Sequence, residues 1–127
     1  MSNQKFSIKD RIKSFSYAFN GFKVLFQEEH NARIHLVAMI AVVFAGFFFH
    51  ISPVEWMIIL ICIGSVFALE IVNSAVENLA DLVTQEKNEF VKKAKDLAAA
   101  AVLASAIISV IIALIIFVPK INTLWLS

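Results

Sequence analysis

Three long apolar runs dominate this 127-residue chain and limit the folds that it can adopt. They lie at about 36–49, 54–69 and 97–118. Hydrophobic residues make up 60% of the sequence, which leaves too little polar surface to cover a soluble bundle. A bilayer span needs roughly 20 residues, and the first two runs reach that length if each helix continues into its polar flank. The sequence therefore predicts one all-α membrane domain over 1–127, with spans at about 30–50, 54–83 and 94–118.

The placement of lysine and arginine predicts how the chain lies in the membrane. Both are frequent before the first span and between the second and third spans, and neither occurs in the connection at 50–55. The positive-inside rule therefore places the N-terminus and the 84–95 loop in the cytoplasm. The net charge of only +1 gives no indication of a nucleic-acid partner. A single cysteine, Cys62, excludes a disulfide framework within one chain.

The polar N-terminal segment, at about 7–28, is predicted to form an amphipathic helix. Its apolar side chains recur at spacings of three and four and so form one stripe along the helix, made of Ile12, Phe15, Phe19, Phe22 and Phe26. Basic residues lie outside this stripe. Ser7 followed by Asp10 is typical of a helix start. Such a helix would lie at the cytoplasmic membrane surface. The alternative is a fourth helix packed on the spans, and a surface helix can do both.

A row of polar residues follows the second apolar run. Glu70, Asn73, Glu77 and Asp81 are separated by three or four residues, so they share one helix face. Counted from Val54 at 1.5 Å per residue, the first carboxylate lies about 24 Å along a hydrocarbon core of roughly 30 Å. A carboxylate at this depth is costly and is therefore a functional candidate. The alternatives are polar contacts between helices and contacts with lipid headgroups.

Acidic residues from other parts of the chain reach the same level. Glu29 precedes the first span, and Asp96 opens the third, so both fall near Glu77 at the predicted cytoplasmic interface. Gathered carboxylates suit Mg²⁺, which takes one or two of them together with phosphate oxygens. The simpler alternatives are a helical ion pair between Glu29 and Arg33, and an acid that favours a helix N-terminus at Asp96.

These segments together resemble the prokaryotic diacylglycerol kinase family, which includes the undecaprenol kinases of Gram-positive bacteria. The resemblance is carried by EIVNSAVENLADLV at 70–83, KKAKDLAAAAVL at 92–103 and YAFNGFKVLFQEEHNARIH at 17–35, and it covers nearly all of 10–118. It implies a homotrimer of three-span subunits in the bacterial cytoplasmic membrane, each with an N-terminal surface helix, and active sites between subunits. It also implies transfer of the γ-phosphate of MgATP to a lipid hydroxyl, with diacylglycerol and undecaprenol as alternative acceptors. The chain has only three glycines, so it holds no glycine-rich phosphate loop.

The resemblance also implies a role for each matching position. It makes Glu70 the catalytic base, with Asn73 beside it. The residues implied to hold Mg²⁺ on the ATP phosphates are Glu29 and Glu77. The residues implied to contact the nucleotide are Tyr17, Glu29, Glu77, Glu86, Lys87, Asn88, Lys95 and Asp96. The residues assigned to the lipid substrate or to support of the site are Arg11, Asn73, Arg33 and His35.

Three positions bear on how far this resemblance extends. The enteric enzymes have an arginine where this chain has Asp10, so Arg11 is expected to replace it. They carry a serine near the lipid where this chain has Ala99. Asn31 and His35 resemble the undecaprenol kinase branch more than the enteric one, although His35 fits an ordinary interfacial histidine equally well.

Small residues along the third span predict association in the membrane. They recur at spacings of three and four and comprise Ala94, Ala98, Ala101, Ser105, Ser109 and Ala113. The alternative is that alanine is merely tolerated there. The acids come from three segments, so completion of the site by a neighbouring subunit is also expected.

A non-enzymatic assembly or transport subunit is the alternative function, but a transport path predicts polar residues along the whole span, and here they gather at one end.

Overall fold

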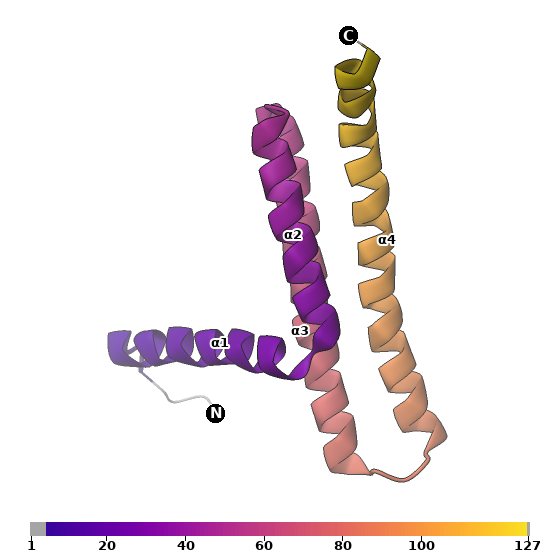
Figure 1. The fold of residues 1–127 in the computed structure, drawn as a ribbon. Helices are drawn as coiled ribbons and strands as arrows, with labels where there is room; N and C mark the ends of the chain where they lie inside the picture. Colours follow the sequence, from indigo (N-terminus) through magenta and orange to yellow (C-terminus); the bar gives the residue numbers. More distant parts are fainter. Residues whose placement is uncertain (1–4, 127) are drawn as a thin grey trace.

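The structure, a computed structural model, describes residues 5–126 and is all-helical over that part of the chain (Figure 1). The helices are α1 (Ile8–Glu28), α2 (His30–Phe48), α3 (Pro53–Val83) and α4 (Glu89–Leu126). α2, α3 and α4 run along one another, and each is long and apolar enough to cross a membrane. The predicted all-α membrane protein with three spans is therefore confirmed.

α1 lies crosswise to the three long helices (Figure 1). It starts as predicted, because Ser7 Oγ accepts a hydrogen bond from the Asp10 backbone N–H at 3.4 Å. At its other end, Arg33 donates from Nε and Nη2 to the carbonyls of Phe26 and Gln27, at 2.7 and 2.6 Å. These carbonyls belong to the last turn of α1, whose C=O groups have no hydrogen-bond donors within the helix. Arg33 therefore fixes the corner between α1 and α2.

The ion pair between Glu29 and Arg33, the simpler alternative for these two residues, does not occur among residues 5–126, where the ion pairs involve other side chains. The physical reason is the interruption of the helix between α1 and α2. Glu29 has extended backbone angles (φ −110°, ψ 112°) and separates α1 from α2. The two residues are thus not on one continuous helix, and the guanidinium binds the end of α1 instead.

The turn between α2 and α3 is fixed by a capping box. Ser52 Oγ accepts from the Glu55 backbone N–H, and Glu55 Oε1 accepts from the Ser52 N–H. Pro53 follows at the first helical position, where its missing N–H costs nothing. Glu55 also pairs with Lys120 of α4, at 2.8 Å between Oε2 and Nζ. The hydrophobic core lies at this end of the bundle and consists of Ile51, Ile59, Ile116 and Phe117.

The third apolar helix is longer than the sequence predicted. It begins at Glu89 because Asn88 Oδ1 accepts hydrogen bonds from the backbone N–H groups of Phe90 and Val91, at 2.9 and 3.1 Å. It then continues beyond 118 to Leu126. Asp96 therefore lies two turns inside the helix, and the interpretation of this residue as a helix N-terminal acid is wrong.

The small residues of α4 face its own chain. Of the six predicted positions only Ala94 is exposed; the half-buried ones are Ala98, Ala101, Ser105, Ser109 and Ala113. α4 makes its most extensive contacts with α3, and small side chains allow two helix backbones to approach closely. This row thus serves packing within the chain and does not by itself indicate a neighbouring subunit.

Candidate active site

The buried polar side chains among the described residues all belong to α3. They are Glu70, Asn73 and Ser74, which are 1%, 8% and 6% exposed. Their spacing places them on one helix face, and that face meets both α2 and the corner between α1 and α2. The predicted polar face of α3 is therefore directed into the protein, and Glu77 continues it as a half-buried side chain.

Glu70 lies against α2. Its Oε1 is 3.2 Å from Nε2 of His35, which is within ion-pair distance. Even so, Glu70 Oε1 makes no hydrogen bond of good geometry within residues 5–126, and neither does Oδ1 of Asn73. Buried polar atoms without partners are rare and costly. Two such oxygens on one face of α3 form a place where a ligand with a hydrogen-bond donor would be stabilised.

Glu29 reaches the same face of α3 from the corner between the helices. Its Oε1 accepts a hydrogen bond from Ser74 Oγ at 3.5 Å. Burial raises the pKa of Glu29, and the neighbouring carboxylates of Glu77 and Glu70 raise it further, against the opposing effect of the Ser74 hydrogen bond. Glu77 is the neighbouring carboxylate that acts most strongly on Glu29. Such crowding of negative charge favours a bound cation.

The donor set at this point fits Mg²⁺ only together with a ligand. Among the residues described, no group of three or more histidine, cysteine or acidic side chains could hold a metal ion. The pair formed by Glu29 and Glu77 would supply two carboxylates, and phosphate oxygens of a nucleotide would complete the coordination. Asp96, which was expected to join them, pairs instead with Lys92 of the preceding turn, at 2.5 Å.

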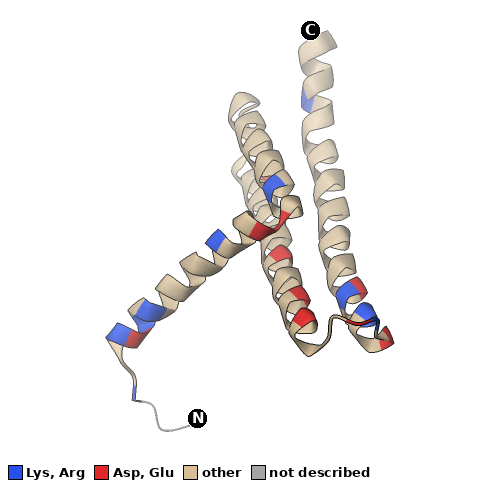
Figure 2. Ribbon diagram, turned by 60° about the horizontal axis from the view of Figure 1, so that its bottom comes forward, with Lys and Arg blue, Asp and Glu red and all other residues tan. Residues whose placement is uncertain are grey.

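The connection between α3 and α4 forms an open hollow of about 790 Å³. Charged residues gather at this end of the two helices (Figure 2). The hollow is lined by all five of the predicted nucleotide contacts in this region, Glu86, Lys87, Asn88, Lys95 and Asp96. Lys95 Nζ binds Asp81 Oδ1 at 2.7 Å and also lies in the field of Glu77, so the hollow and the carboxylate pair adjoin each other.

Two predicted residues lie apart from this arrangement. Tyr17 on α1 is 71% exposed, and its side chain makes no hydrogen bond, ion pair or ring contact within the described chain. Arg11 is also exposed, and its guanidinium lies 6.0 Å from the ring centroid of Phe6. Both belong to the part of α1 that extends away from the long helices (Figure 1). The structure does not bring them to the carboxylates.

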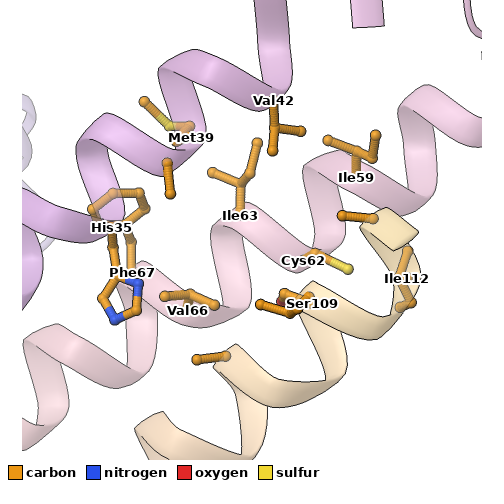
Figure 3. A pocket seen from close by; sticks show the side chains of 14 residues that line it. His35, Met39, Val42, Ile59, Cys62, Ile63, Val66, Phe67, Ser109 and Ile112 are labelled. Carbon is orange, nitrogen blue, oxygen red and sulfur yellow. The ribbon is translucent and has the colours of Figure 1, made fainter. Parts of the chain in front are cut away.

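A small apolar cavity of about 160 Å³ lies between α2, α3 and α4. Its lining is almost entirely aliphatic and aromatic, with Cys62 and Ser109 among the few exceptions. His35 and Phe67 stand at one end of it (Figure 3). Glu70 does not line the cavity, but its Oε1 lies 3.2 Å from Nε2 of His35, which does.

The sequence interpretation missed two features of this site. Ser74 follows Glu70 by four residues and therefore shares its face, but it was not identified as the partner of Glu29. The spacing alone could have indicated it. The cavity beside His35 could not be found in this way, because it depends on how three helices pack.

Comparison with known proteins identifies the family. A family model described as prokaryotic diacylglycerol kinase matches residues 16–117. An undecaprenol kinase of Bacillus subtilis is 44% identical over 86% of this chain and 89% of its own length. Diacylglycerol kinases of Synechocystis and Escherichia coli K12 are 36% and 28% identical, over 89% and 87% of this chain and 65% and 91% of their own lengths. The chain thus belongs to the prokaryotic diacylglycerol kinase family.

Proposed function

We propose that this chain, a lipid kinase by its family, transfers the γ-phosphate of MgATP to the primary hydroxyl of undecaprenol. The observation that carries the proposal is the buried Glu70, whose unsatisfied oxygen adjoins His35 at the junction of three helices. A hydroxyl that enters there would donate its hydrogen bond to an oxygen that otherwise has none. Glu70 would then serve as the base that drives removal of the hydroxyl proton.

The nucleotide would approach from the hollow between α3 and α4. Glu29 and Glu77 would hold Mg²⁺, which when bound neutralises charge on the phosphate oxygens. Lys95 lies between this pair and the hollow, where its ammonium group suits a phosphate. The loop residues 86–88 would surround the rest of the nucleotide. Asn73, with its free Oδ1 next to Glu70, would orient the acceptor.

The choice of acceptor rests on the comparisons. Identity to the undecaprenol kinase is 44%, against 36% and 28% for the two diacylglycerol kinases. The cavity beside His35 would receive the part of the hydrocarbon chain nearest to the hydroxyl. No observation favours the non-enzymatic assembly or transport function.

The setting in the membrane is proposed from charge, exposure and resemblance. The carboxylates and the charged loop would face the cytoplasm, which supplies ATP, and so would the N-terminus. α1 would lie at the membrane surface, since it exposes large apolar side chains with no partner in the described chain, among them Phe15, Phe19 and Phe22. A homotrimer follows from the family resemblance. Arg33 would support the site by holding the corner that carries Glu29.

A labelled-phosphate assay tests this function. Purified full-length protein would be given γ-labelled ATP, Mg²⁺ and either undecaprenol or diacylglycerol in matched mixed micelles. We expect faster labelling of undecaprenol, and loss of labelling when Mg²⁺ is chelated. Faster labelling of diacylglycerol would contradict the proposed acceptor, and labelling of neither lipid would contradict the kinase activity.

A further inference from the structure

We infer that Asp81 is a positioning residue for the nucleotide, because it holds the ammonium group of Lys95 where a phosphate of MgATP would bind. This role rests on the proposed function and adds to it the last acid of the polar row on α3, which the proposed function does not use. Asp81 Oδ1 lies 2.7 Å from Lys95 Nζ. Both side chains line the hollow between α3 and α4, so the acid acts on the nucleotide through the lysine.

The ion pair between Asp81 and Lys95 joins two helices. Asp81 lies in the last turn of α3 and Lys95 in the second turn of α4, 14 residues further along the chain. The pair formed by Lys92 and Asp96 lies within α4 alone, so it cannot fix one helix relative to the other. Asp81 therefore sets the position of the Lys95 ammonium relative to α3, the helix that carries Glu77.

Lys95 keeps hydrogen-bond donors for a ligand while it is paired. An ammonium group has three N–H donors, and within residues 5–126 its one side-chain hydrogen bond goes to Asp81. The lysine side chain is 37% exposed and the aspartate 56%. Ion pairs this exposed contribute little to the stability of a fold. A phosphate in the hollow can thus bind Lys95 without displacing Asp81.

The benefit of the pair is preorganisation. A lysine has a long flexible stem and loses rotamer freedom when its ammonium is held by a ligand. Asp81 imposes much of this ordering before the nucleotide arrives, and such preorganisation increases affinity. Lys95 also lies in the field of Glu77, so the ammonium is directed toward the carboxylates proposed for Mg²⁺. For a lysine side chain, the rotamer freedom at stake corresponds to about tenfold in affinity.

Charge alone predicts the opposite effect. Asp81 is an acid beside a site proposed for a polyanion, and like charges repel. If Asp81 acted on the nucleotide only through its charge, its neutralisation would strengthen MgATP binding. If it positions Lys95, its neutralisation weakens MgATP binding. The sign of the change therefore distinguishes the two roles.

The first test is Asp81→Asn in the full-length protein, a change that keeps the shape and removes the charge. We expect the Kd for MgATP, measured by titration calorimetry, and the KM for MgATP to rise by about 3- to 10-fold. The KM for undecaprenol should not change. Asp81→Glu retains a carboxylate on a longer stem and should recover part of the affinity.

Glu55→Gln is the matched control. It breaks the other ion pair between α3 and α4, in which Glu55 Oε2 lies 2.8 Å from Lys120 Nζ at the far end of the two helices. Glutamine keeps a side-chain oxygen for the Ser52 backbone N–H, so the capping box survives. We expect an unchanged Kd for MgATP in this variant. An equal rise in Kd would mean that loosened helices, and not the position of Lys95, weaken binding, and would overturn the inference.

The second test is a double-mutant cycle with Lys95→Met. If Asp81 acts through Lys95, Asp81→Asn should cause no further weakening of MgATP binding once the ammonium is gone. The same factor of weakening in both backgrounds would overturn the inference. If Asp81→Asn does not fold, Asp81→Glu carries the cycle, because moving the carboxylate should weaken binding only when Lys95 is present.

The remaining outcomes separate this role from the proposed function. An unchanged or lower Kd for MgATP in folded Asp81→Asn would overturn the positioning role while the kinase activity stands. If the unmodified protein binds MgATP but labels neither lipid, the proposed function fails and the cycle still decides the role of Asp81. If the unmodified protein does not bind MgATP, both are overturned.

Discussion

Replacing Gly46 with alanine should destabilise the chain, although alanine is the better helix former. A carbon added at this position of α2 would lie 2.7 Å from Cη2 of Trp56 and 3.1 Å from Cδ1 of Ile51. Carbon atoms pack favourably at about 3.5–4.0 Å, so the indole ring would have to move. Its freedom is limited, because its centroid lies 4.9 Å from that of the Phe47 ring.

The expected magnitude follows from two opposing effects. Overpacking typically costs about 1–3 kcal/mol, while glycine to alanine in a helix interior gains about 1 kcal/mol. The net loss in the free energy of unfolding is about 1 kcal/mol. Gly64 in α3 has no atom within 4 Å of the corresponding carbon position, so Gly64→Ala should show only the gain. The difference between the two variants isolates the overpacking cost, about 2 kcal/mol.

Thermal unfolding of the two purified variants in the same detergent measures this difference. For a chain of this length, about 2 kcal/mol corresponds to a difference in Tm of about 8 °C, with Gly64→Ala the more stable. Equal midpoints would refute the close packing of α2 on Trp56. A Gly46→Ala protein more stable than the unmodified chain would show that the ring swings aside without cost.

Three further predictions concern the carboxylates. Glu70→Gln should abolish labelling of the lipid while MgATP binding survives, and near-normal turnover would contradict its role. Glu29→Gln and Glu77→Gln should each weaken MgATP binding, and the double change should cost less than the sum because both act through one ion; strictly additive losses would indicate separate roles. Because one chain brings these carboxylates together, mixing inactive Glu70→Gln and Glu77→Gln subunits should leave the mixture inactive, and restored activity would show that they serve one site from different chains.

The sequence predicted the helices and the polar face of α3 because both depend on local patterns. Apolar length and helical spacing are properties of neighbouring residues, so Glu70, Asn73 and Glu77 could be placed on one face without knowledge of the tertiary structure. The start of α1 at Ser7 was likewise evident from its capping residues.

Two expectations failed because they depended on where a helix begins or ends. Asp96 was expected beside Glu77, but the early start of α4 places it next to Lys92 on the same helix. A helical ion pair between Glu29 and Arg33 was one alternative for these residues, and it does not form because Arg33 donates to the carbonyls at the end of α1. Neither outcome is encoded in spacing, because each depends on where a helix begins or ends.

The expectation that a neighbouring subunit must complete the carboxylate group rested on a related assumption. Short connections seemed unable to bring acids from separate segments to one point. The long α3 removes the difficulty, since it extends past the start of α2 and presents its polar face to the corner that holds Glu29 (Figure 1). Completion of the site by a neighbouring subunit stays a prediction, because the structure describes one chain.

The break at Glu29 connects the fold to the chemistry. A helix running straight from α1 into α2 would carry the Glu29 side chain on its own surface and keep the whole segment parallel to α3. The extended backbone at this residue instead turns α1 away from the bundle and directs the carboxylate to Ser74. The turn leaves the last carbonyls of α1 without helical partners, and Arg33 satisfies two of them. Loss of this guanidinium should therefore weaken Mg²⁺ binding at the proposed site without any contact to the ion, because the corner that positions Glu29 would no longer be held.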